Sequence, residues 1–417
     1  MPSDLQRAVD SLGQQIDRSV SLDDSKMRLQ AYSPHHGPVD AARLGSLLHR
    51  EVPNEWILWA HSLGVGKSKG PIRLPANTSL GFDFPRVGVP VRSNGLLLGY
   101  LWIIDPGGDL GADDLDRAQR CATEVAAILH RDQLLDQMRT EQETQLARDL
   151  LSTDPDLRRA AARRVAELRL CPAESAFAAV VVQVTTDAIA ADTAGELALL
   201  GGLDRVGRAL HPRHWLQTVV GDKAVVAFAC GGPTEAADFA QALYDATVHG
   251  CGTDTTLRVG IGDPQPSLEE VHLSYSQAAR AISIATTVGR QSPVTAWSGL
   301  GAYRLLSRLS AADLAEHALH PGLRNLLASD GSEELLLTLE CYLDNAGAVK
   351  ESAAALFVHR GSLYHRLARI EKIAGVRLAD GEDRLAMHLG LKAARLLGLI
   401  PGAEPVIERQ LRPAANT

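Results

Sequence analysis

Aromatic residues are scarce in this 417-residue sequence: they make up 4% of it, so alanine, leucine and valine must supply most of the packing. The longest apolar run, LLLGYLWII at 96–104, is far short of the roughly 20 residues that span a bilayer. Cys-x-x-Cys spacing is also missing, which indicates a reduced compartment and argues against a zinc site. The cysteines are Cys121, Cys171, Cys230, Cys251 and Cys341.

Positive charge is in short supply as well. Asp and Glu number 50 against 42 Lys and Arg, a net charge of −8. Such a surface does not attract nucleic acid as a whole, so any DNA-binding function must rest on a local basic patch. Charged residues such as Asp4 and Arg7 interrupt the first twenty positions, which predicts no signal peptide. We therefore expect a cytoplasmic protein that does not engage a membrane.

A chain of this length predicts two to four domains. Residues 1–135 have the pattern of a mixed α/β domain, with the clearest signal in RVGVPVRSNGLLLGYLWIID. Apolar residues alternate up to the tight-turn dipeptide Asn94-Gly95, and a second apolar run follows, which predicts a β-hairpin. A helix is expected next, over LDRAQRCATEVAAILHRDQLLDQM. A helix after a closing hairpin suits a small-molecule sensor domain.

Residues 136–171 form a predicted helical linker. Leu134, Met138, Leu146 and Leu150 make a sparse apolar stripe, which fits either a connecting helix or a short dimer seam. Between 172 and 310 the patterns alternate, which predicts a sheet covered by helices. Strands are expected at AFAAVVVQV, twice in HWLQTVVGDKAVVAFAC, at TLRVGIG and at SPVTAW, with helices near 194–210, from 233 and over 268–288.

Strand signals vanish in residues 311–400, which predicts an all-α domain. Ser332 is expected to cap a helix that ends before Gly347, and a last helix should close the domain before Pro401. Residues 401–417 are rich in Pro and Ala and predict a flexible tail. The predicted fold class is multidomain, with two α/β domains followed by a helical one.

Two short helices joined by a tight turn are predicted within ESAAALFVHRGSLYHRLARIEK. The first helix and its turn offer a small apolar surface, formed by Ala353, Ala354, Leu356 and Val358. The second offers a matching stripe at spacing i, i+4, i+7, formed by Leu363, Leu367 and Ile370. Alanine lets helices approach closely, so the pair has the geometry of a helix-turn-helix.

The other face of the second helix is basic. Between 359 and 377 there are five basic residues and one acid, a local charge of +4 (5 − 1), and phosphate contact requires such an excess. His359 stands at the N-cap position, and Arg360 is the candidate for a bidentate guanine contact. The predicted DNA-binding residues are His359, Arg360, Gly361, Ser362, Tyr364, His365, Arg366, Arg369 and Lys372.

A merely solvated amphipathic helix would show a similar bare pattern, but the paired helices favour DNA binding. The stretch AAALFVHRGSLYHRLARIEKIAGVRL, with DGEDRLAMHLGLKAARLL after it, resembles the C-terminal domain of PucR/CdaR-type bacterial transcription regulators. Its core VHRGSLYHRL is also similar to the Fis-type helix-turn-helix. The resemblance implies binding to double-stranded DNA. Gly361-Ser362 and Tyr364 depart from the usual family residues, so no base preference carries over.

TLRVGIGDPQPSLEEVHLSYSQAARAISIA is similar to the last strand and helix of the GGDEF-like domain of the same regulators, a nucleotide-cyclase-like fold. A working diguanylate cyclase needs two carboxylates to hold divalent metal. Gln183 stands where one is expected, and Lys223 follows Asp222 where a second acid should stand. We therefore expect no metal, no cofactor and no cyclase activity. The resemblance then implies a dimerisation or relay scaffold.

GPIRLPANTSLGFDFPRVGVPVRSNGLLLGYLWIID resembles the GAF-type sensor domain of PucR-like regulators, which implies binding of an effector. Trp56 and Trp59 are weak candidates for ligand binding: core packing is the simpler interpretation, and the aromatic wall of a pocket is the alternative. Cys121 is expected in the core. The segment GVGKSKG is not a P-loop, because His61 occupies the place of the required glycine.

These patterns predict a ligand-responsive, DNA-binding transcription regulator that is not an enzyme. The predicted domains are a GAF-like sensor (1–135), a linker (136–171), a degenerate GGDEF-like domain (172–310), a helix-turn-helix domain (311–400) and a tail (401–417). One recognition helix buries little surface, so a homodimer or higher homo-oligomer on two half-sites is expected, shifted between states by an unknown small-molecule effector. The alternative is a nucleotide-handling signalling enzyme whose C-terminal helices serve only for association.

Overall fold

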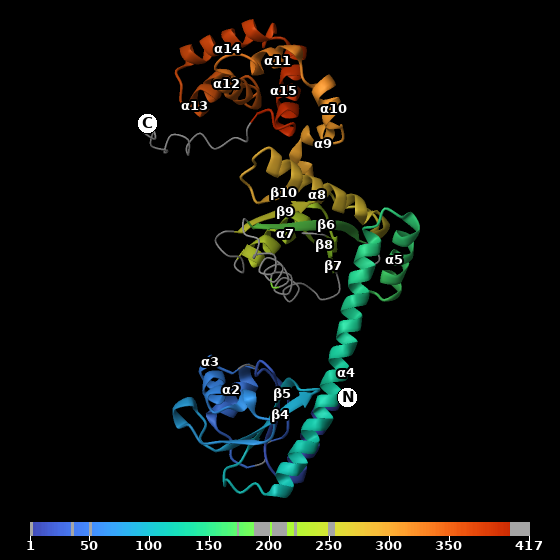
Figure 1. The fold of residues 1–417 in the computed structure, drawn as a ribbon, viewed down its shortest axis with the longest axis vertical. Coiled ribbons are helices and arrows are strands. Elements are labelled where there is room, and N and C mark those ends of the chain that lie inside the picture. The colour runs from blue at the N-terminus through green and yellow to red at the C-terminus, as the bar shows by residue number, and fades with distance from the viewer. Residues whose placement is uncertain are drawn as a thin grey trace. The chain divides into compact units, whose positions relative to one another are not determined.

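The computed structural model describes residues 3–34, 37–49, 52–172, 175–186, 201, 215–220, 223–248 and 255–400 (Figure 1). The chain divides into two compact units, Met1–Glu141 and Gln142–Thr417. Within the described ranges, no helix has the length and apolar character to cross a membrane.

The first unit is built on a five-stranded antiparallel sheet with the order β2-β1-β5-β4-β3. Its strands are β1 (Val20–Asp24), β2 (Leu29–Tyr32), β3 (Ile72–Leu74), β4 (Arg86–Ser93) and β5 (Leu96–Ile104). The predicted hairpin is confirmed between β4 and β5. Asn94 and Gly95 take φ angles of 50° and 83° at its turn, as a two-residue type I′ turn requires.

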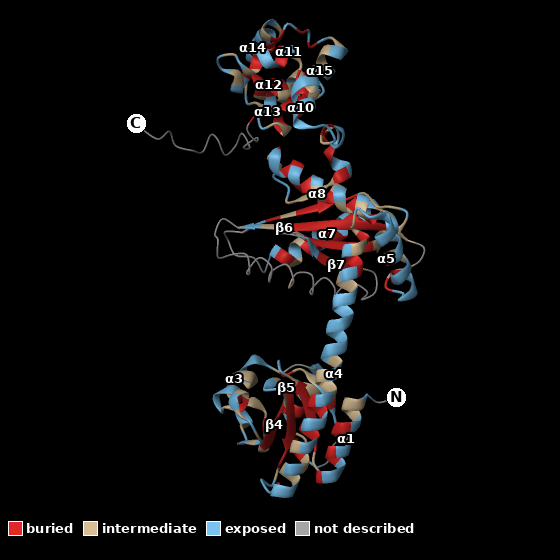
Figure 2. Ribbon diagram, turned by 45° about the vertical axis from the view of Figure 1, so that its right-hand side comes forward, coloured by how far each residue is buried: buried red, intermediate tan, exposed pale blue. Residues whose placement is uncertain are grey.

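Alternation along the strands gives this sheet two different faces, and its inner strands β4 and β5 are largely buried (Figure 2). Val87, Val89, Leu101 and Ile103 point to one face, where α1 (Asp4–Ile16) and α4 (Ala112–Leu150) cover them. Cys121 of α4 belongs to this core, as expected, and burial raises the pKa of its thiol to about 12. The thiol therefore stays protonated at neutral pH and serves as a packing group.

The opposite face carries the aromatic side chains of β5. Tyr100 and Trp102 pack there with Ala60 of α3 (Asn54–Ser62), and α2 (Ala41–His49) lies on the same side. Two short 3-10 turns, η1 (Val65–Lys67) and η2 (Thr78–Leu80), complete the layer. The GVGKSKG segment forms η1 between a helix and a strand, so it lacks the strand-loop-helix frame of a P-loop.

Helix α4 runs without a break from Ala112 to Leu150 and contributes residues to both units. The residues of the predicted apolar stripe lie in two different environments along this helix. Leu134 and Met138 are 46% and 66% exposed, whereas Leu146 and Leu150 are buried in a core with Leu216 of the second unit. The stripe is therefore not one continuous dimer seam, because its second half packs within this chain. Asp154 then caps α5 (Pro155–Glu167).

The second unit contains a sheet of order β10-β9-β6-β8-β7. Its strands are β6 (Ala176–Thr186), β7 (Trp215–Val220), β8 (Lys223–Cys230), β9 (Thr255–Ile261) and β10 (Val294–Ala296). Helix α7 (Pro233–Val248) covers one face, and α8 (Val271–Thr287), preceded by η3 (Leu268–Glu270), covers the other. The predicted strands and these helices are confirmed; the helix expected near 194–210 lies outside the described residues.

From Trp297 to Leu396 the described elements are helical, and α11 to α15 share one apolar core. The elements are η4 (Trp297–Leu300), α9 (Tyr303–Leu306), α10 (Ala311–Asp313), the π-turn η5 (Leu314–Ala318), α11 (Pro321–Leu327), α12 (Ser332–Asp344), α13 (Val349–Ala355), α14 (Arg360–Ala374) and α15 (Gly381–Leu396). The predicted fold class, two α/β domains and a helical one, is confirmed. The predicted tail, 401–417, lies outside the described residues.

One predicted helix cap is wrong. Gly331, not Ser332, occupies the N-cap position of α12, with φ 71° and no side-chain hydrogen bond. Ser332 is instead the first helical residue. Serine is the commoner cap, but the chain enters α12 in the left-handed region, where glycine has no Cβ to clash.

Candidate DNA-binding site

Helices α13 and α14 form the predicted helix-turn-helix, joined by residues 356–359. His359 is confirmed as the N-cap of α14: its Nδ1 accepts a hydrogen bond from the backbone N–H of Gly361 at 3.2 Å. Because the first N–H groups of a helix have no partner within it, this bond fixes where α14 begins. Gly375 ends the helix with φ 66°.

One face of α14 is held in the core of the helical domain. The buried residues are those that the spacing predicted, Leu363, Leu367 and Ile370. On α13 the prediction was partly wrong, since Ala353 is buried but Ala354 is exposed, and Ser352 packs inward instead. Ser352 tolerates burial because its hydroxyl donates to the Ala348 carbonyl at 2.7 Å.

The opposite face of α14 is open to solvent. Exposed there are eight of the nine predicted contact residues, which we call the recognition face: His359, Arg360, Gly361, Ser362, Tyr364, His365, Arg369 and Lys372. Tyr364 is 60% exposed, unusual for an aromatic ring that is not involved in binding. Arg369 donates to the Asp330 carbonyl at 3.1 Å, a contact that leaves its positive charge un-neutralised.

Arg366 is the ninth predicted residue, and the structure turns it inward. Its Nη2 lies 2.5 Å from Oε1 of Glu334, and its Nη1 donates to Oγ1 of Thr338 at 3.4 Å. Both partners belong to α12, which the long arginine side chain reaches from the flank of α14. Arg366 therefore fastens α14 to α12, and its charge is already paired.

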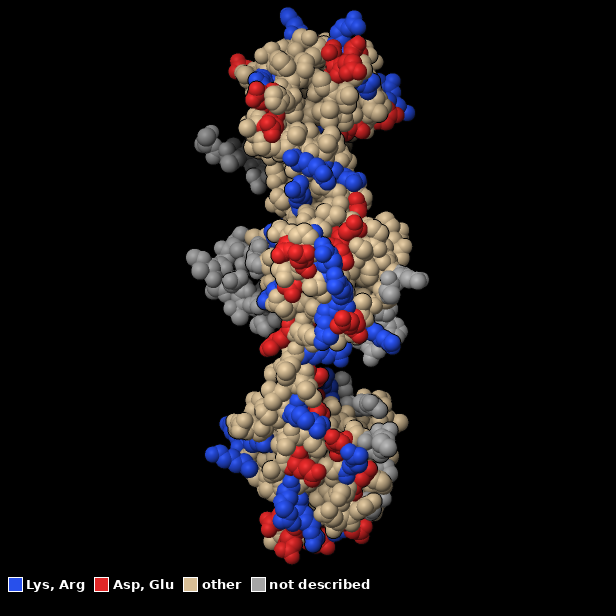
Figure 3. All heavy atoms as spheres, turned by 90° about the vertical axis from the view of Figure 1, so that its right-hand side faces the viewer, with Lys and Arg blue, Asp and Glu red and all other residues tan. Residues whose placement is uncertain are grey.

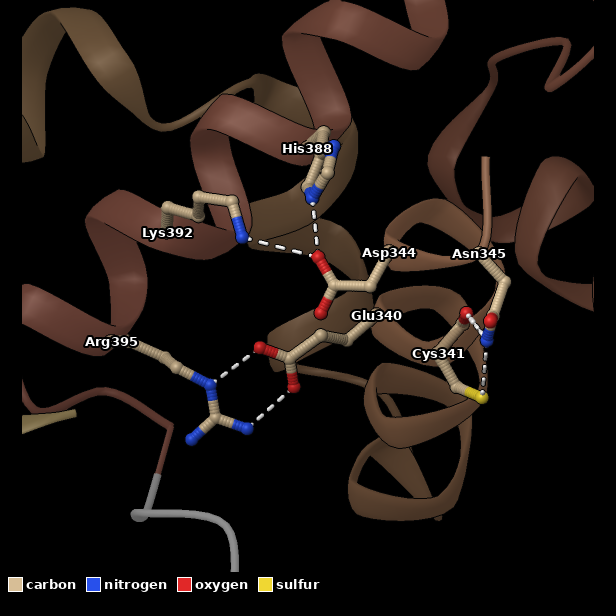
Figure 4. A network of polar contacts seen from close by, with 7 residues as sticks. All are labelled: Glu340, Cys341, Asp344, Asn345, His388, Lys392 and Arg395. Atoms are coloured by element: carbon tan, nitrogen blue, oxygen red, sulfur yellow. Dashed lines mark hydrogen bonds and ion pairs between the residues drawn. The ribbon is translucent and has the colours of Figure 1, made fainter. Parts of the chain in front are cut away.

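A polar network ties α12 to α15 (Figure 4). Arg395 donates from Nε and Nη2 to the two carboxylate oxygens of Glu340, at 2.6 and 2.5 Å. One turn along α12, Oδ1 of Asp344 lies 2.8 Å from His388 Nε2 and 3.2 Å from Lys392 Nζ. The hydrogen bond with His388 holds the pKa of Asp344 below its usual value. The network fixes the helix on which α14 rests.

Phe357, in the turn of the helix-turn-helix, was not identified from the sequence. Its φ is 56°, in the left-handed region, and 68% of its surface is exposed. Between Leu356 and Val358 it looked like part of an apolar run, so no signal for exposure was present. The ring stands two residues before the cap of α14, next to the recognition face in the chain.

Lys and Arg side chains are interspersed with Asp and Glu on the face drawn in Figure 3. A mixed surface creates no long-range field of one sign.

A second candidate site is a cavity in the first unit, on the α2 and α3 side of the sheet. Trp56 and Trp59, the predicted pair, are both half-buried at its wall. The Phe82 ring lies 4.8 Å from that of Trp56 and 5.0 Å from that of Trp59, between ring centroids. Trp102 also lines the cavity, with the charged residues Asp23 and Arg86.

Two cations flank Gln183 in the middle domain, at the position where a cyclase is expected to carry a carboxylate. Gln183 on β6 pairs in register with Lys223 on β8 and Arg258 on β9. Directly opposed residues lie roughly 5 Å apart, so both cations are close neighbours of position 183. No cluster of three potential metal ligands occurs among the residues that the structure describes. Asp222 is outside them.

Two known protein families match parts of this chain. Residues 335–393 match the PucR C-terminal helix-turn-helix domain, and residues 152–284 match the GGDEF-like domain. The first match contains α13, α14 and most of α12 and α15. The protein is a helix-turn-helix DNA-binding protein.

Relatives match almost the whole chain. It is 25% identical over 409 residues to the proline-responsive transcriptional activator PutR of Bacillus subtilis (strain 168), covering 93% of this chain and 96% of PutR. It is 22% identical to the DNA-binding transcriptional activator AdeR of the same organism, covering 93% and 92%. A regulator of polyketide synthase expression from Bifidobacterium adolescentis aligns with a TM-score of 0.28 and 16% identity, over 62% of this chain and 98% of that one. The chain is a PucR-type transcription regulator.

Proposed function

We propose that α14 is the recognition helix and that its recognition face contacts promoter DNA. The observation that carries this is a polar and basic helix face, exposed from His359 to Lys372, whose opposite face is locked into a core. Residues near the start of a recognition helix reach base edges, which assigns sequence reading to Arg360, Tyr364 and His365. Arg369 and Lys372 are assigned to phosphates. Arg366 is assigned to positioning α14.

Selection of bound genomic fragments with the purified protein tests this proposal. We expect enrichment of one sequence motif, organised as two half-sites. The same selection with Arg360→Ala should lose the motif. Enrichment of that motif by the Arg360→Ala variant at undiminished strength would show that another part of the chain reads the DNA.

The regulator is proposed to act as a homodimer. A single recognition helix buries too little surface for tight and specific binding, so two copies are needed on two half-sites. Leu135 and Met138, 57% and 66% exposed on α4, are candidates for the contact between copies. Sedimentation of a Leu135→Ser, Met138→Ser variant should show a lighter species than the parent. Leu157→Ser, on α5 and 45% exposed, is the matched control that should leave the dimer intact.

Ligand responsiveness is proposed to reside in the cavity of the first unit. The support is the combination of aromatic walls with charged residues inside one cavity, which is typical of a small-molecule site. The similarity to PutR, a proline-responsive activator, points in the same direction. A small molecule that shifts DNA affinity of the parent protein, but not of a Trp59→Ala variant, would support this assignment.

The GGDEF-like domain is proposed to be a scaffold without cyclase activity, in a protein that works in the cytoplasm. Its support is the pairing of Gln183 with Lys223 and Arg258, since two cations repel the divalent metal that GTP chemistry requires. Incubation with GTP and magnesium should give no product. Turnover that Asp222→Ala abolishes would favour the alternative, a signalling enzyme.

A further inference from the structure

We propose that the cavity of the first unit binds a small zwitterion, with its ammonium group at Asp23, its carboxylate at Arg86 and its apolar body on Trp102. This inference rests on the proposed ligand responsiveness and specifies the chemical class of the effector. It is built from the strand register, the buried charges and the polar atoms left without partners.

The strand register places the two charges on either side of one aromatic ring. Asp23 of β1 is opposite Tyr100 of β5, and Arg86 of β4 is opposite Ile104. Trp102 lies between these two positions on β5, and residues two apart share a face. A ligand lying over Trp102 therefore has the carboxylate of Asp23 near one end and the guanidinium of Arg86 near the other.

Trp102 reaches this position because Gly88 faces it. The two residues are direct partners across β4 and β5, and a Cβ atom added to Gly88 would lie 2.6 Å from Cζ3 of Trp102. The glycine thus lets the indole lie flat over the sheet. The indole also lies close enough to Asp23 to favour its charged form.

Asp23 is suited to a cationic partner. It is only 6% exposed, on a wall that is otherwise largely apolar and aromatic. Arg43 and Arg86 favour its charged form, but burial outweighs both, so a further positive group would stabilise the carboxylate. Ammonium groups also interact favourably with aromatic faces, which Trp56, Trp59 and Trp102 supply here. Burial raises the pKa of Asp23 to about 7, and a bound ammonium group would restore the charged form.

Arg86 is suited to an anionic partner. Its guanidinium is held over the Phe82 ring, 4.5 Å from the centroid, and its Nη2 donates to Oδ1 of Asp40 at 2.6 Å. Its Nε is buried without a hydrogen-bond partner, as is Oδ2 of Asp40. An acceptor that enters the cavity beside Arg86 could satisfy this N–H. A carboxylate is the acceptor that a guanidinium prefers.

Charge and size further restrict the chemical class of the ligand. A ligand carrying only a positive charge would lie close to Arg86, and one carrying only a negative charge would lie close to Asp23 and Asp40. A zwitterion satisfies both Asp23 and Arg86 and adds no net charge to the buried site. The cavity volume of about 40 Å³ exceeds the roughly 10–15 Å³ that one water needs. That space suits a small molecule.

Thermal melting and titration calorimetry of the full chain test the proposal with three sets of probes. The first set is the twenty standard L-amino acids; the second is their decarboxylated amines, and the third is the carboxylic acids that lack the amino group. We expect at least one amino acid to raise the melting temperature, while its own amine and acid bind at least about tenfold more weakly, as loss of one charge-assisted hydrogen bond implies.

Variants locate the binding. Asp23→Asn should weaken the binding of the amino acid at least about tenfold, because it removes the charge that meets the ammonium group. Arg86→Lys should do the same while keeping a cation beside Asp40, since it deletes Nε. The matched controls are Asp24→Asn and Arg92→Gln. In the parent protein the Asp24 carboxylate pairs with Arg28, and Arg92 donates to the Ser68 and Gly66 carbonyls. Neither residue lines the cavity, and both variants should bind normally.

The outcomes separate this inference from the function on which it rests. If an amine or an acid binds as tightly as the amino acid from which it derives, ligand responsiveness stands and the zwitterion is wrong. If an amino acid binds equally well to Asp23→Asn and Arg86→Lys, the site is elsewhere. If no probe from any set binds, the inference is overturned. DNA affinity of the same preparation, measured in parallel, shows whether the protein remains a competent regulator in each case.

Discussion

Arg395 of α15 and Glu340 of α12 form a two-point ion pair in which the arginine side chain is 6% exposed and the glutamate side chain 16%. Arg395→Met would leave the carboxylate with no counter-charge in a largely dry site, which typically costs about 3 kcal/mol or more of unfolding free energy. The double variant Arg395→Met, Glu340→Leu should recover much of that loss. Chemical denaturation of the full chain measures both.

Lys392→Met is the matched control for this pair. Its partner Asp344 has a side chain that is 51% exposed, so the loss should stay below about 1 kcal/mol. Equal losses for Arg395→Met and Lys392→Met would mean that burial does not set the strength of these contacts.

Three substitutions on α14 separate base reading from phosphate contact. Arg360→Ala should reduce the preference for the operator over random DNA by about 1–3 kcal/mol. Arg369→Ala and Lys372→Ala should weaken binding to all sequences and lower the salt slope by about 1 each. Fluorescence anisotropy at several salt concentrations distinguishes the two effects. Unchanged affinity in all three variants would reject the recognition face.

Stability of the first unit should fall as the pH rises from about 4 to 7. The pKa of Asp23 is raised from 3.8 to about 7 because it is buried; Asp24 adds to the rise, and Arg43, Arg86 and the Trp102 hydrogen bond oppose it. The folded state therefore binds more protons than the unfolded state within this window, so the stability conferred by protonated Asp23 is lost as pH rises.

Asp23→Asn should remove this pH dependence and stabilise the first unit above pH 7, by on the order of a few kcal/mol. Melting curves of the full chain from pH 4.5 to 8, followed by tryptophan fluorescence, give the comparison. Asp24→Asn should keep most of the parent slope, because burial, the largest cause of the Asp23 pKa shift, is unchanged. A slope that survives in Asp23→Asn would have to be assigned to another group.

Relief of backbone strain should stabilise the helix-turn-helix. Phe357→Gly removes the Cβ that makes φ 56° unfavourable, a gain of about 1 kcal/mol, while little packing is lost because the ring is exposed. Phe357→Ala keeps the strain and should not gain. Denaturation midpoints of the two variants isolate the backbone effect; an equal gain in both would attribute it to the exposed ring.

Local patterns predicted much of this protein. Alternation fixed the β4–β5 hairpin, and the i, i+4, i+7 spacing selected the three residues that bury α14, because each depends only on near neighbours in the chain. His359 was recognisable for the same reason. The domain boundaries and the individual DNA contacts remain predictions.

What the sequence concealed depends on distant partners. Arg366 is basic and lies on the flank of α14, and only the position of Glu334 on α12 shows that it turns inward. Leu146 and Leu150 continue the apolar stripe that begins at Leu134. They are nevertheless buried, because a sheet whose strands come later in the chain packs against them. Asp23 and Arg86 are 63 residues apart (86 − 23), so no local spacing could join them in one cavity.

The fit of Trp102 against Gly88 carries a consequence for evolution. A side chain at position 88 would push the indole out over the cavity, so the two positions cannot vary independently. Among related regulators, a larger residue at the position of Gly88 should be accompanied by a smaller one at that of Trp102. Those lineages should then have changed the effector to which they respond, with the DNA-binding helices untouched.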